Sequence, residues 1–403
     1  MDIKRHVFKD LQQGIGEPQV LILTGPLQVG KTTLMRHLES KCQELGKRTR
    51  FLDLEQPQDL ARLTGDPGEV IEALIGDIDV VFVDEFYYLA DAGRIFKSIY
   101  DHAAARGAPV KIVASGSSST EIHGHLQESL AGRTLTYQIY PVSWQEYSSW
   151  ASPDRPGFDD YLRFGGLPGL AKVSTGERKQ QLLEEYLSAY LFKDIKALIR
   201  EENIRAFNHL LQLLATHQGQ LVEFSKLARE LRVNAETVAS CLSILDRTYV
   251  NFLLPSFHTN LANELKKSRK TYLYDLGVRN SILRDFRTVE EREDRGAVHE
   301  TFVFLTLRAL LKPNMELRFW RTKRKEEVDF VLVVDRVPFP IEVKSHLNSP
   351  HLHSGLRAFC RKYPSVTQTF TVSDRAFDTI QEGSVLHHFL DFESAHTLLG
   401  HLQ

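Results

Sequence analysis

Three features that a chain of this length can have are scarce or missing. There are three cysteines, Cys42, Cys241 and Cys360, and they lie far apart without a CxxC pair. Neither a disulfide framework nor a cysteine zinc site is therefore predicted. No apolar run approaches the roughly 18 residues that suggest a membrane-spanning helix, and the charged N-terminus does not look like a signal peptide. This pattern is typical of a cytoplasmic protein.

A large excess of charge of either sign is also missing. The formal net charge is −2, with 25% charged and 42% hydrophobic residues, as in ordinary soluble globular proteins. Because the chain as a whole is not basic, any contact with nucleic acid has to come from local basic patches. The 403 residues are too many for one hydrophobic core, so roughly two to four domains are expected.

The most specific motif is a glycine-rich loop in VLILTGPLQVGKTTLMRHL, at 20–38. An apolar strand runs into Gly25-x4-Gly30-Lys31-Thr32 and then into a helix, which is the context that a phosphate loop requires. The glycines let backbone N–H groups point at the β- and γ-phosphates, and the N-terminus of the helix adds positive potential. Lys31 would neutralise phosphate charge, and the Thr32 hydroxyl would ligate Mg²⁺. The predicted ATP contacts from this motif are Gly25, Pro26, Gln28, Val29, Gly30, Lys31, Thr32 and Thr33.

A second apolar strand ends in two acids, in DIDVVFVDEF at 77–86. We expect Asp84 to hold the Mg²⁺ through water and Glu85 to polarise the attacking water. A strand capped by surface acids is the alternative, which the distance from the phosphate loop disfavours. A third strand in PVKIVASGSSS would place Ser117 or Ser118 as a γ-phosphate sensor, although serines at a strand end are also common turn formers.

Two further strands carry three charged side chains, in EEVDFVLVVDRVPFPIEVKS at 326–345. A two-residue turn at 335–336 makes Asp329 face Glu342, and Lys344 follows two residues later on the same face. Asp-Arg is a poor sequence for such a turn. A slip of one residue in register would turn these side chains to the other face.

Two facing carboxylates repel each other, which is tolerable where a divalent cation lies between them. Asp329 and Glu342 would then bind Mg²⁺, while Lys344 would hold the attacking water or steady a phosphate. A surface hairpin with salt-bridged charges is the alternative. Basic clusters flank this region, and we expect them to bind nucleic-acid phosphates without sequence preference. They comprise Lys266, Lys267, Arg269 and Lys270, and Arg318, Arg321, Lys323, Arg324 and Lys325 around Trp320.

The spacing of Asp329 and Glu342-Val343-Lys344 resembles the PD-(D/E)xK nuclease core. That family often adds a helical acid upstream of the hairpin. The resemblance assigns this place to Glu300, in GAVHETFVFLTLRALL, whose apolar residues recur at helical spacing. It implies a catalytic set of Glu300, Asp329, Glu342 and Lys344.

Nearly the whole chain resembles a group of prokaryotic AAA-type ATPases that carry a C-terminal restriction-endonuclease-like region. Besides the phosphate loop and the hairpin, the shared motifs are GSSS, SLAGR, YPVSWQEY, GGLPGL and YLFKDI. The resemblance implies an ATPase with Arg133 as an arginine finger. A finger acting in trans requires a homo-oligomer, for which a hexamer is one form. It also implies that Pro168 packs on the adenine. Arg133 could instead pair with a neighbouring acid, and Gly-Gly-Leu-Pro could be a turn between helices.

The middle of the chain predicts a helical lid and then a helix, a turn, a helix and a strand, as in a winged helix. The second of these helices would expose Glu236, Thr237, Ser240 and Ser243, which argues against base-specific readout. The predicted fold is α/β, with a P-loop AAA-type ATPase core, a lid, a winged-helix domain and a C-terminal α/β restriction-endonuclease-like domain. The expected boundaries are 1–150, 151–205, 206–270 and 271–403.

Three functions are compatible with these patterns. The first is an oligomeric ATPase that engages DNA and carries a Mg²⁺-dependent nuclease module. The second is a nucleotide-gated regulatory switch. The third is a binder of branched DNA whose nuclease-like domain grips without cutting.

Overall fold

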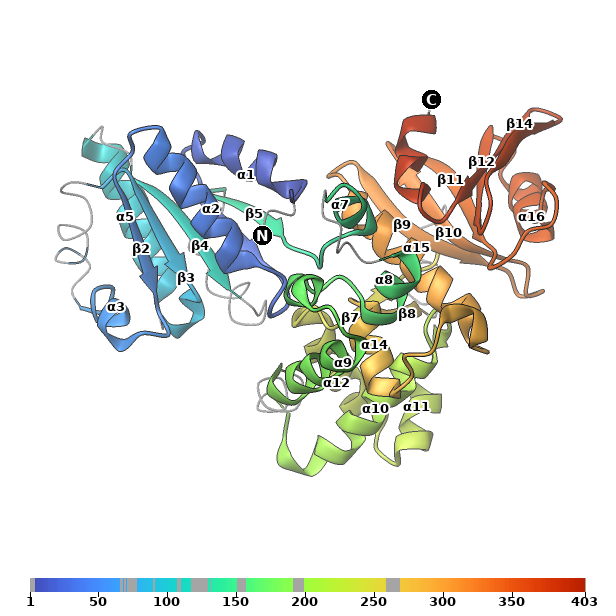
Figure 1. Cartoon of the computed structure of the whole chain (residues 1–403), viewed down its shortest axis with the longest axis horizontal. Helices are drawn as coiled ribbons and strands as arrows, with labels where there is room; N and C mark the ends of the chain where they lie inside the picture. The colour runs from blue at the N-terminus through green and yellow to red at the C-terminus, as the bar shows by residue number, and fades with distance from the viewer. Residues whose placement is uncertain are drawn as a thin grey trace. The chain divides into compact units, whose positions relative to one another are not determined.

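The computed structural model describes residues 4–65, 68, 70, 78–89, 91–106, 110–116, 130, 132–150, 157–190, 199–258 and 269–402 (Figure 1). The chain divides into two compact units. The first unit comprises Met1–Val142 with Arg247–Val250, and the second comprises Ser143–Asp246 with Asn251–Gln403. Four residues to which the sequence assigns roles, Ser117, Ser118, Lys266 and Lys267, lie outside the described residues.

The core of the first unit is a five-stranded parallel sheet with the strand order β2-β3-β4-β1-β5. Two of its strands, VLILT and VVFVD, are continuous apolar runs, and all their residues are buried. Runs of this kind form parallel sheets that are covered on both faces. The strands are β1 (Val20–Thr24), β2 (Thr49–Asp53), β3 (Val80–Asp84), β4 (Lys111–Gly116) and β5 (Thr134–Gln138).

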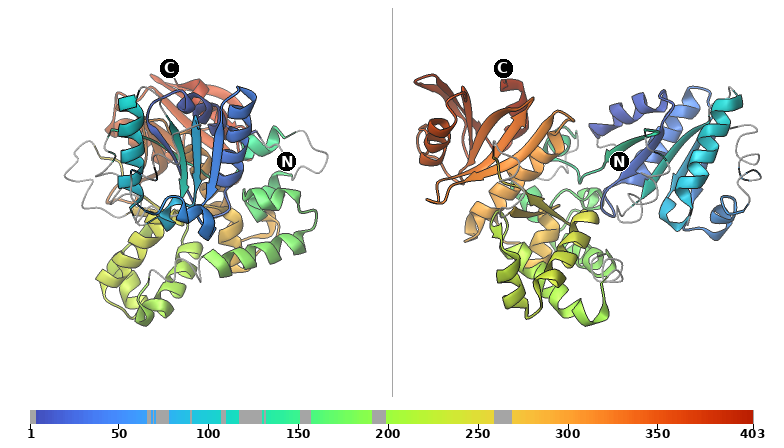
Figure 2. Two further views of the ribbon diagram at one scale, coloured as in Figure 1. Left: turned by 90° about the vertical axis from the view of Figure 1, so that its left-hand side faces the viewer. Right: turned by 180° about the vertical axis from the view of Figure 1, so that it is seen from behind.

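Helices cover both faces of this sheet (Figure 2). The chain moves along the sheet in one direction from β1 to β2, and in the opposite direction from β3 to β4. Right-handed crossovers therefore put the connecting helices α2 and α5 on opposite faces. The carboxyl ends of all five strands meet at one edge, which carries the first candidate site. The helices are α1 (Val7–Ile15), α2 (Lys31–Glu44), α3 (Pro57–Ala61), α5 (Ala92–Arg106) and the short η1 (Phe86–Tyr88).

The second unit begins with short helices and a three-stranded antiparallel sheet in the order β6-β8-β7. The predicted helix, turn, helix and strand are present, and Asn234 caps the second helix by accepting from the backbone N–H of Thr237 at 2.7 Å. The helices are α7 (Trp144–Ser148), α8 (Phe158–Phe164), η2 (Pro168–Lys172), α9 (Gly176–Tyr186), η5 (Glu201–Asn203), α10 (Ile204–Thr216), α11 (Phe224–Leu231), α12 (Ala235–Arg247), α14 (Leu276–Leu283) and η6 (Val289–Glu291). The strands are β6 (Leu221–Val222), β7 (Asn251–Leu254) and β8 (Arg269–Leu273).

A six-stranded mixed sheet completes the second unit, in the order β13-β14-β12-β11-β10-β9. Strands β9 to β11 are antiparallel, whereas β11, β12 and β14 run parallel. Helix α16 connects β11 to β12 and packs Leu356 and Phe359 into a core with Trp320 and Val331. The elements are α15 (Arg295–Leu310), β9 (Met315–Arg321), β10 (Glu327–Val334), β11 (Val337–Val343), α16 (Ser354–Lys362), β12 (Gln368–Ser373), β13 (Phe377–Glu382), β14 (Val385–Asp391) and η7 (Ala395–His401).

The hairpin of β10 and β11 has the register that the sequence predicts. Its closing pair is Val334 with Val337, so the turn consists of Asp335 and Arg336. Their φ angles are 47° and 71°, the left-handed pair that a type I′ turn requires. Because neither residue favours that conformation as glycine does, the strands rather than the turn have to fix the register.

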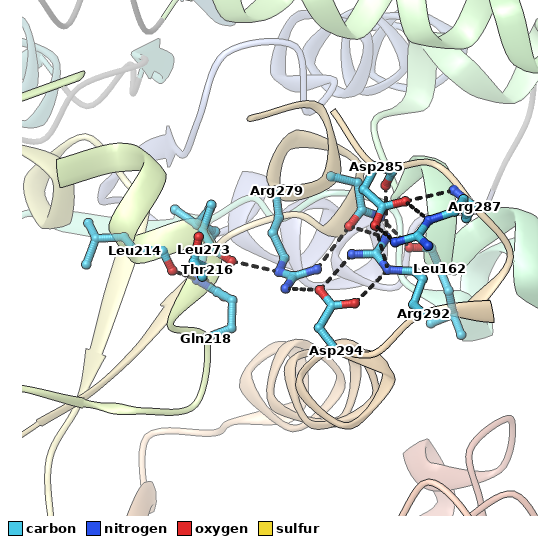
Figure 3. A network of polar contacts seen from close by, with 12 residues as sticks. Leu162, Leu214, Thr216, Gln218, Leu273, Arg279, Asp285, Arg287, Arg292 and Asp294 are labelled. Carbon is cyan, nitrogen blue, oxygen red and sulfur yellow. Dashed lines mark hydrogen bonds and ion pairs between the residues drawn. The ribbon is translucent and has the colours of Figure 1, made fainter. Parts of the chain in front are cut away.

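A network of buried charges joins α14 to the start of α15 (Figure 3). The guanidinium groups of Arg279 and Arg292 are fully buried and both contact Asp294, at 2.5 Å and 2.8 Å. Both also donate to the side-chain oxygen of Asn280, at 3.1 Å and 2.9 Å. This network holds the helical part of the second unit to the helix that precedes the six-stranded sheet.

Candidate functional site

The first candidate site lies where β1 ends and α2 begins. Gly25 has a φ of 143°, and a Cβ there would lie 2.2 Å from the carbonyl oxygen of Ile139, so only glycine fits. Gly30, with a φ of 94°, turns the loop into α2. The Nζ of Lys31 is buried and donates to the carbonyl oxygens of Gly25 and Pro26, at 3.0 Å and 2.8 Å. The lysine therefore lies inside the loop that the sequence identifies as a phosphate cradle.

The other predicted residues of this loop continue the cradle. Gln28 takes a left-handed φ of 59°, and Val29 is fully buried beneath the loop. Thr32 and Thr33 are exposed on the first turn of α2. An exposed threonine at this place can ligate a metal ion that bridges nucleotide phosphates.

Two acids at the end of β3 face the lysine of the loop. Asp84 is buried and accepts a hydrogen bond from the Ser115 hydroxyl. Burial raises the pKa of Glu85 to about 7, with Lys31 opposing the rise and Asp84 adding to it. One carboxyl oxygen of Glu85, Oε2, is buried and has no hydrogen-bond partner among the described residues. Burial lowers the pKa of Lys31, while Glu85 and Asp84 oppose that change.

Ser115 is a residue that the sequence analysis missed. The sensor was assigned to the serines that follow β4, whereas Ser115 lies within the strand and is fully buried. The parallel pairing of Val83 with Ala114 places the next residues, Asp84 and Ser115, side by side. The signal was available in the sequence, because two parallel strands that end at the same edge bring their last residues together.

Arg5 was not assigned a role from the sequence either. Its guanidinium donates to the carbonyl oxygen of Val29 in the phosphate loop at 3.0 Å, and to that of Tyr140 at 2.6 Å. The arginine therefore ties the loop to the segment that follows β5.

The two residues that the resemblance assigns to ATP have different surroundings. Arg133 lies 3.5 Å from Asp101, as the alternative interpretation of this residue expected. Pro168 begins η2 and is half-buried in the second unit. The turn before it is held by the fully buried Asp275, which accepts from the backbone N–H of Gly166 at 2.8 Å. The predicted roles of Arg133 and Pro168 stay predictions.

The second candidate site lies on the hairpin of β10 and β11. The last register pair of the hairpin is Phe330 with Ile341, so the next residues outward are Asp329 and Glu342. The Oδ2 of Asp329 accepts from the backbone N–H of Val343 at 2.9 Å. The Nζ of Lys344 donates to Oε1 of Glu342 at 2.5 Å. The three charged side chains predicted from the sequence thus converge on one place.

The site also contains a lysine, Lys270, whose burial the sequence analysis did not predict. Lys270 was expected in an exposed basic cluster, but its side chain is 2% exposed, so it is not available to DNA. Its Nζ lies 3.0 Å from Glu300, 2.8 Å from Glu327 and 3.7 Å from Asp329. The lysine and the three acids come from β8, α15 and β10, and only their packing reveals the group.

The carboxyl groups of this site have strongly shifted pKa values. Burial raises the pKa of Glu342 to about 8, with Asp329 adding to the rise and Lys344 opposing it. Burial raises the pKa of Glu300 to about 7, against the effect of Lys270. Burial alone would lower the pKa of Lys270, but Glu300, Asp329 and Glu327 together raise it.

The predicted Mg²⁺ ligands of this site, Asp329 and Glu342, stay predictions. In the described part of the chain, no three or more His, Cys, Asp or Glu side chains are grouped so that they could hold a metal ion. Glu300, which the resemblance counts with the nuclease acids, is engaged by the Lys270 ammonium and by the Tyr272 hydroxyl, at 2.6 Å.

Three family models match successive parts of the chain. Residues 17–148 match the AAA domain, 155–289 a domain of unknown function (DUF8612) and 295–387 a second one (DUF4143). The AAA match agrees with the parallel sheet, the phosphate loop and the acids at the strand ends. The first unit therefore contains a P-loop ATPase domain of the AAA class, and its cofactors are ATP and Mg²⁺. The exposed Thr32, the buried Lys31 and the unpartnered Glu85 oxygen fit this pair.

Similar proteins are known in bacteria and archaea. The chain is 29% identical over 357 residues to the "Uncharacterized protein Rv2008c" of Mycobacterium tuberculosis, covering 88% of this chain and 76% of that one. It is 24% identical over 266 residues to the "Uncharacterized protein MJ1544" of Methanocaldococcus jannaschii, covering 62% and 58%.

Solved structures resemble the chain only distantly. AMPPCP-bound DnaA from Aquifex aeolicus has 13% identity and a TM-score of 0.32, covering 60% of this chain and 86% of that one. The Pif1 helicase from Candida albicans has 15% identity and a TM-score of 0.26, covering 34% and 40%. These TM-scores are too low to support a conclusion. None of the helices within the described ranges is long and apolar enough to cross a membrane.

Proposed function

We propose that the protein hydrolyses ATP in its first unit and engages DNA through its second unit. In this proposal the C-terminal domain has a restriction-endonuclease-like fold that holds DNA without cutting it. The observation that carries the DNA part is an exposed basic surface on the six-stranded sheet. The proposed domains are the ATPase core at 1–150, a lid at 151–205, a winged helix at 206–270 and the nuclease-like domain at 271–403.

The ATPase chemistry follows from the first candidate site. Bound Mg²⁺-ATP supplies the γ-phosphate that water attacks. Lys31 would neutralise phosphate oxygens, Thr32 would ligate the ion and Asp84 would hold it through water. Glu85 accepts the proton of the attacking water at its unpartnered oxygen, and Ser115 keeps Asp84 in place.

The basic surface consists of two neighbouring groups. Lys323, Arg324 and Lys325 are exposed in the turn between β9 and β10. Arg361, at the end of α16, lies 3.7 Å from Glu326, and the exposed Lys362 follows it. The residues of the basic surface are thus Lys323, Arg324, Lys325, Arg361 and Lys362. Such a cluster binds phosphates of any sequence and loses affinity steeply as salt rises.

An oligomer is part of the proposal because Arg133 is suited to reach a second subunit. Its pairing with Asp101 is long, at 3.5 Å, and both side chains are more than a third exposed. Exposed pairs of this kind contribute little free energy, so the arginine could leave Asp101 at small cost. Pro168 would then contact the adenine from the lid.

A Mg²⁺-dependent nuclease is the second candidate function. The convergence of Asp329, Glu342 and Lys344 on the hairpin favours it. It requires a metal ion at Asp329 and Glu342. Incubation of linear, single-stranded and branched DNA with Mg²⁺ or Mn²⁺ tests this candidate. Cleavage that disappears in Asp329→Ala while ATP hydrolysis persists would establish the nuclease in place of the gripping role.

The main proposal is tested by ATP hydrolysis with and without DNA, together with gel shifts at increasing salt. We expect DNA to stimulate hydrolysis in the wild type and no hydrolysis in Lys31→Ala. Changing Lys323, Arg324 and Lys325 to Glu should abolish both the shift and the stimulation while basal hydrolysis remains. The control changes three exposed lysines of the first unit, Lys9, Lys41 and Lys97, to Glu. Equal loss in both triple variants would disprove the role of the basic surface.

A further inference from the structure

Lys270 lies where a charged side chain is rarely found. It leaves β8 in the small sheet and ends among carboxyl groups of α15 and β10, with 2% of its side chain exposed. A buried ammonium is stable only when opposite charges surround it. Here three acids do so within 3.7 Å of its Nζ, namely Glu300, Glu327 and Asp329.

Two further side-chain cations, Arg321 and Lys344, lie next to the carboxyl groups of this site. Arg321 lies 3.1 Å from the second oxygen of Glu327. Lys344 donates to Glu342 at 2.5 Å. Four carboxyl groups thus face three side-chain cations, before any ion from solution is counted.

We propose that Lys270 is the built-in counter-cation of this site and replaces the divalent metal ion that the hairpin would otherwise bind. The domain then holds its acids together without metal, which extends the gripping role proposed above. Lys270 lies on the three-stranded sheet, and its ion pairs with Glu327 and Asp329 connect that sheet to the six-stranded sheet. The positive charge at the hairpin site therefore comes from a strand that precedes the hairpin in the sequence.

Geometry explains why the lysine and a metal exclude each other. A Mg²⁺ bound to Asp329 and Glu342 would lie about 2.0–2.1 Å from their oxygens. The Lys270 ammonium is already 3.0 Å from Glu300 and 3.7 Å from Asp329, so the two cations would be close neighbours in a poorly solvated place. Burial and three acidic partners prevent the lysine from moving away.

Mn²⁺ binding to the full-length protein, without nucleotide, tests the proposal. Free Mn²⁺ is measured from its electron paramagnetic resonance signal. We expect no binding to Asp329 in the wild type, seen as identical curves for wild type and Asp329→Asn. Lys270→Met removes the charge but keeps the length of the side chain, and it should gain one site that binds about tenfold or more tightly than the wild type. The double variant with Asp329→Asn should lose this site, and Lys270→Arg should behave as the wild type.

Each result decides the matter. Wild-type binding that Asp329→Asn removes would overturn the proposal, and so would a folded Lys270→Met that gains no site. If Lys270→Met does not fold alone, refolding in buffer with Mn²⁺ but not in the matched Mn²⁺-free buffer supports the proposal, and failure to refold in Mn²⁺ overturns it. The test uses no DNA, so its failure is distinct from failure of the basic surface.

Discussion

Two groups of buried charges in the second unit are built differently. In the network of Figure 3, Arg279 and Arg292 share Asp294 as an ion-pair partner. Other N–H groups of the two arginines donate to backbone carbonyl oxygens and to the side-chain oxygen of Asn280. Burial opposes the change, but the two arginines hold the pKa of Asp294 below its ordinary value. Around Lys270, acids outnumber cations, and burial raises the pKa of Glu342 to about 8.

The direction of the pKa shift distinguishes buried acids that stabilise the fold from buried acids that take part in function. A buried group whose charge is fully matched gains little by changing its protonation state. A buried acid with a raised pKa is held in a costly environment, and such groups gather at functional sites. Glu85 in the first unit is also a buried acid with a raised pKa, because burial raises it to about 7.

Changing Glu85 should have the largest effect, a loss of ATP hydrolysis. It tests whether buried acids with a raised pKa mark functional sites. Glu85→Gln keeps the size of the side chain but cannot accept a proton, so we expect ATP hydrolysis to fall by about 10²–10⁴-fold. Nucleotide binding should persist. In the wild type, the rate should rise through about pH 7 as Glu85 ionises. The exposed acid Glu55 provides the control variant, Glu55→Gln, and an equal loss there would contradict the assignment.

Breaking the network of Figure 3 should destabilise the second unit more than the other substitutions proposed for it. Asp294→Ala leaves two buried guanidinium groups with less opposite charge, which costs about 3–5 kcal/mol of unfolding free energy. All three tryptophans, Trp144, Trp150 and Trp320, belong to this unit, so their fluorescence in urea reports its unfolding.

The control for this variant is Glu382→Ala, which removes the partner of Arg357 from an exposed ion pair. Its urea midpoint should stay close to that of the wild type. The wild type should also lose stability as pH falls below 3.8, since a lowered pKa stabilises only while the acid is ionised. A variant as stable as the wild type would show that the network is not needed for folding.

The sequence predicts local groups well and long-range groups poorly. The phosphate loop is contiguous, and the hairpin register follows from strand periodicity across a short turn, so Asp329 and Glu342 could be paired in advance. Lys270 could not be assigned, because its neighbours come from three separate elements. Surface charge and buried charge look alike in a sequence, and only packing tells them apart.

Acids of the second unit that have a raised pKa should affect stability with the opposite pH dependence to Asp294. A raised pKa stabilises fully below 4.5, the ordinary value for Glu342, and that stability is lost as pH rises through about 8. Glu342→Gln cannot ionise, so it should be more stable than the wild type by at least about 1–2 kcal/mol above this pH, because each unit of pKa shift corresponds to about 1.4 kcal/mol. Tryptophan-monitored urea unfolding at pH 5 and pH 9 gives the two differences. Equal differences at both pH values would show that Glu342 ionises normally.

Arg5 represents a third arrangement, in which a cation is bonded to backbone carbonyls, and its loss should have the smallest effect. Without the bonds to Val29 and Tyr140, the phosphate loop is held less firmly before ATP binds. Arg5→Ala should therefore raise the KM for ATP by about three- to tenfold, the equivalent of one hydrogen bond, and leave kcat within about twofold. The exposed neighbour Lys4 supplies the control, Lys4→Ala, which should change neither constant. A variant with unchanged KM but lower thermal stability would show that Arg5 supports the fold and not the loop.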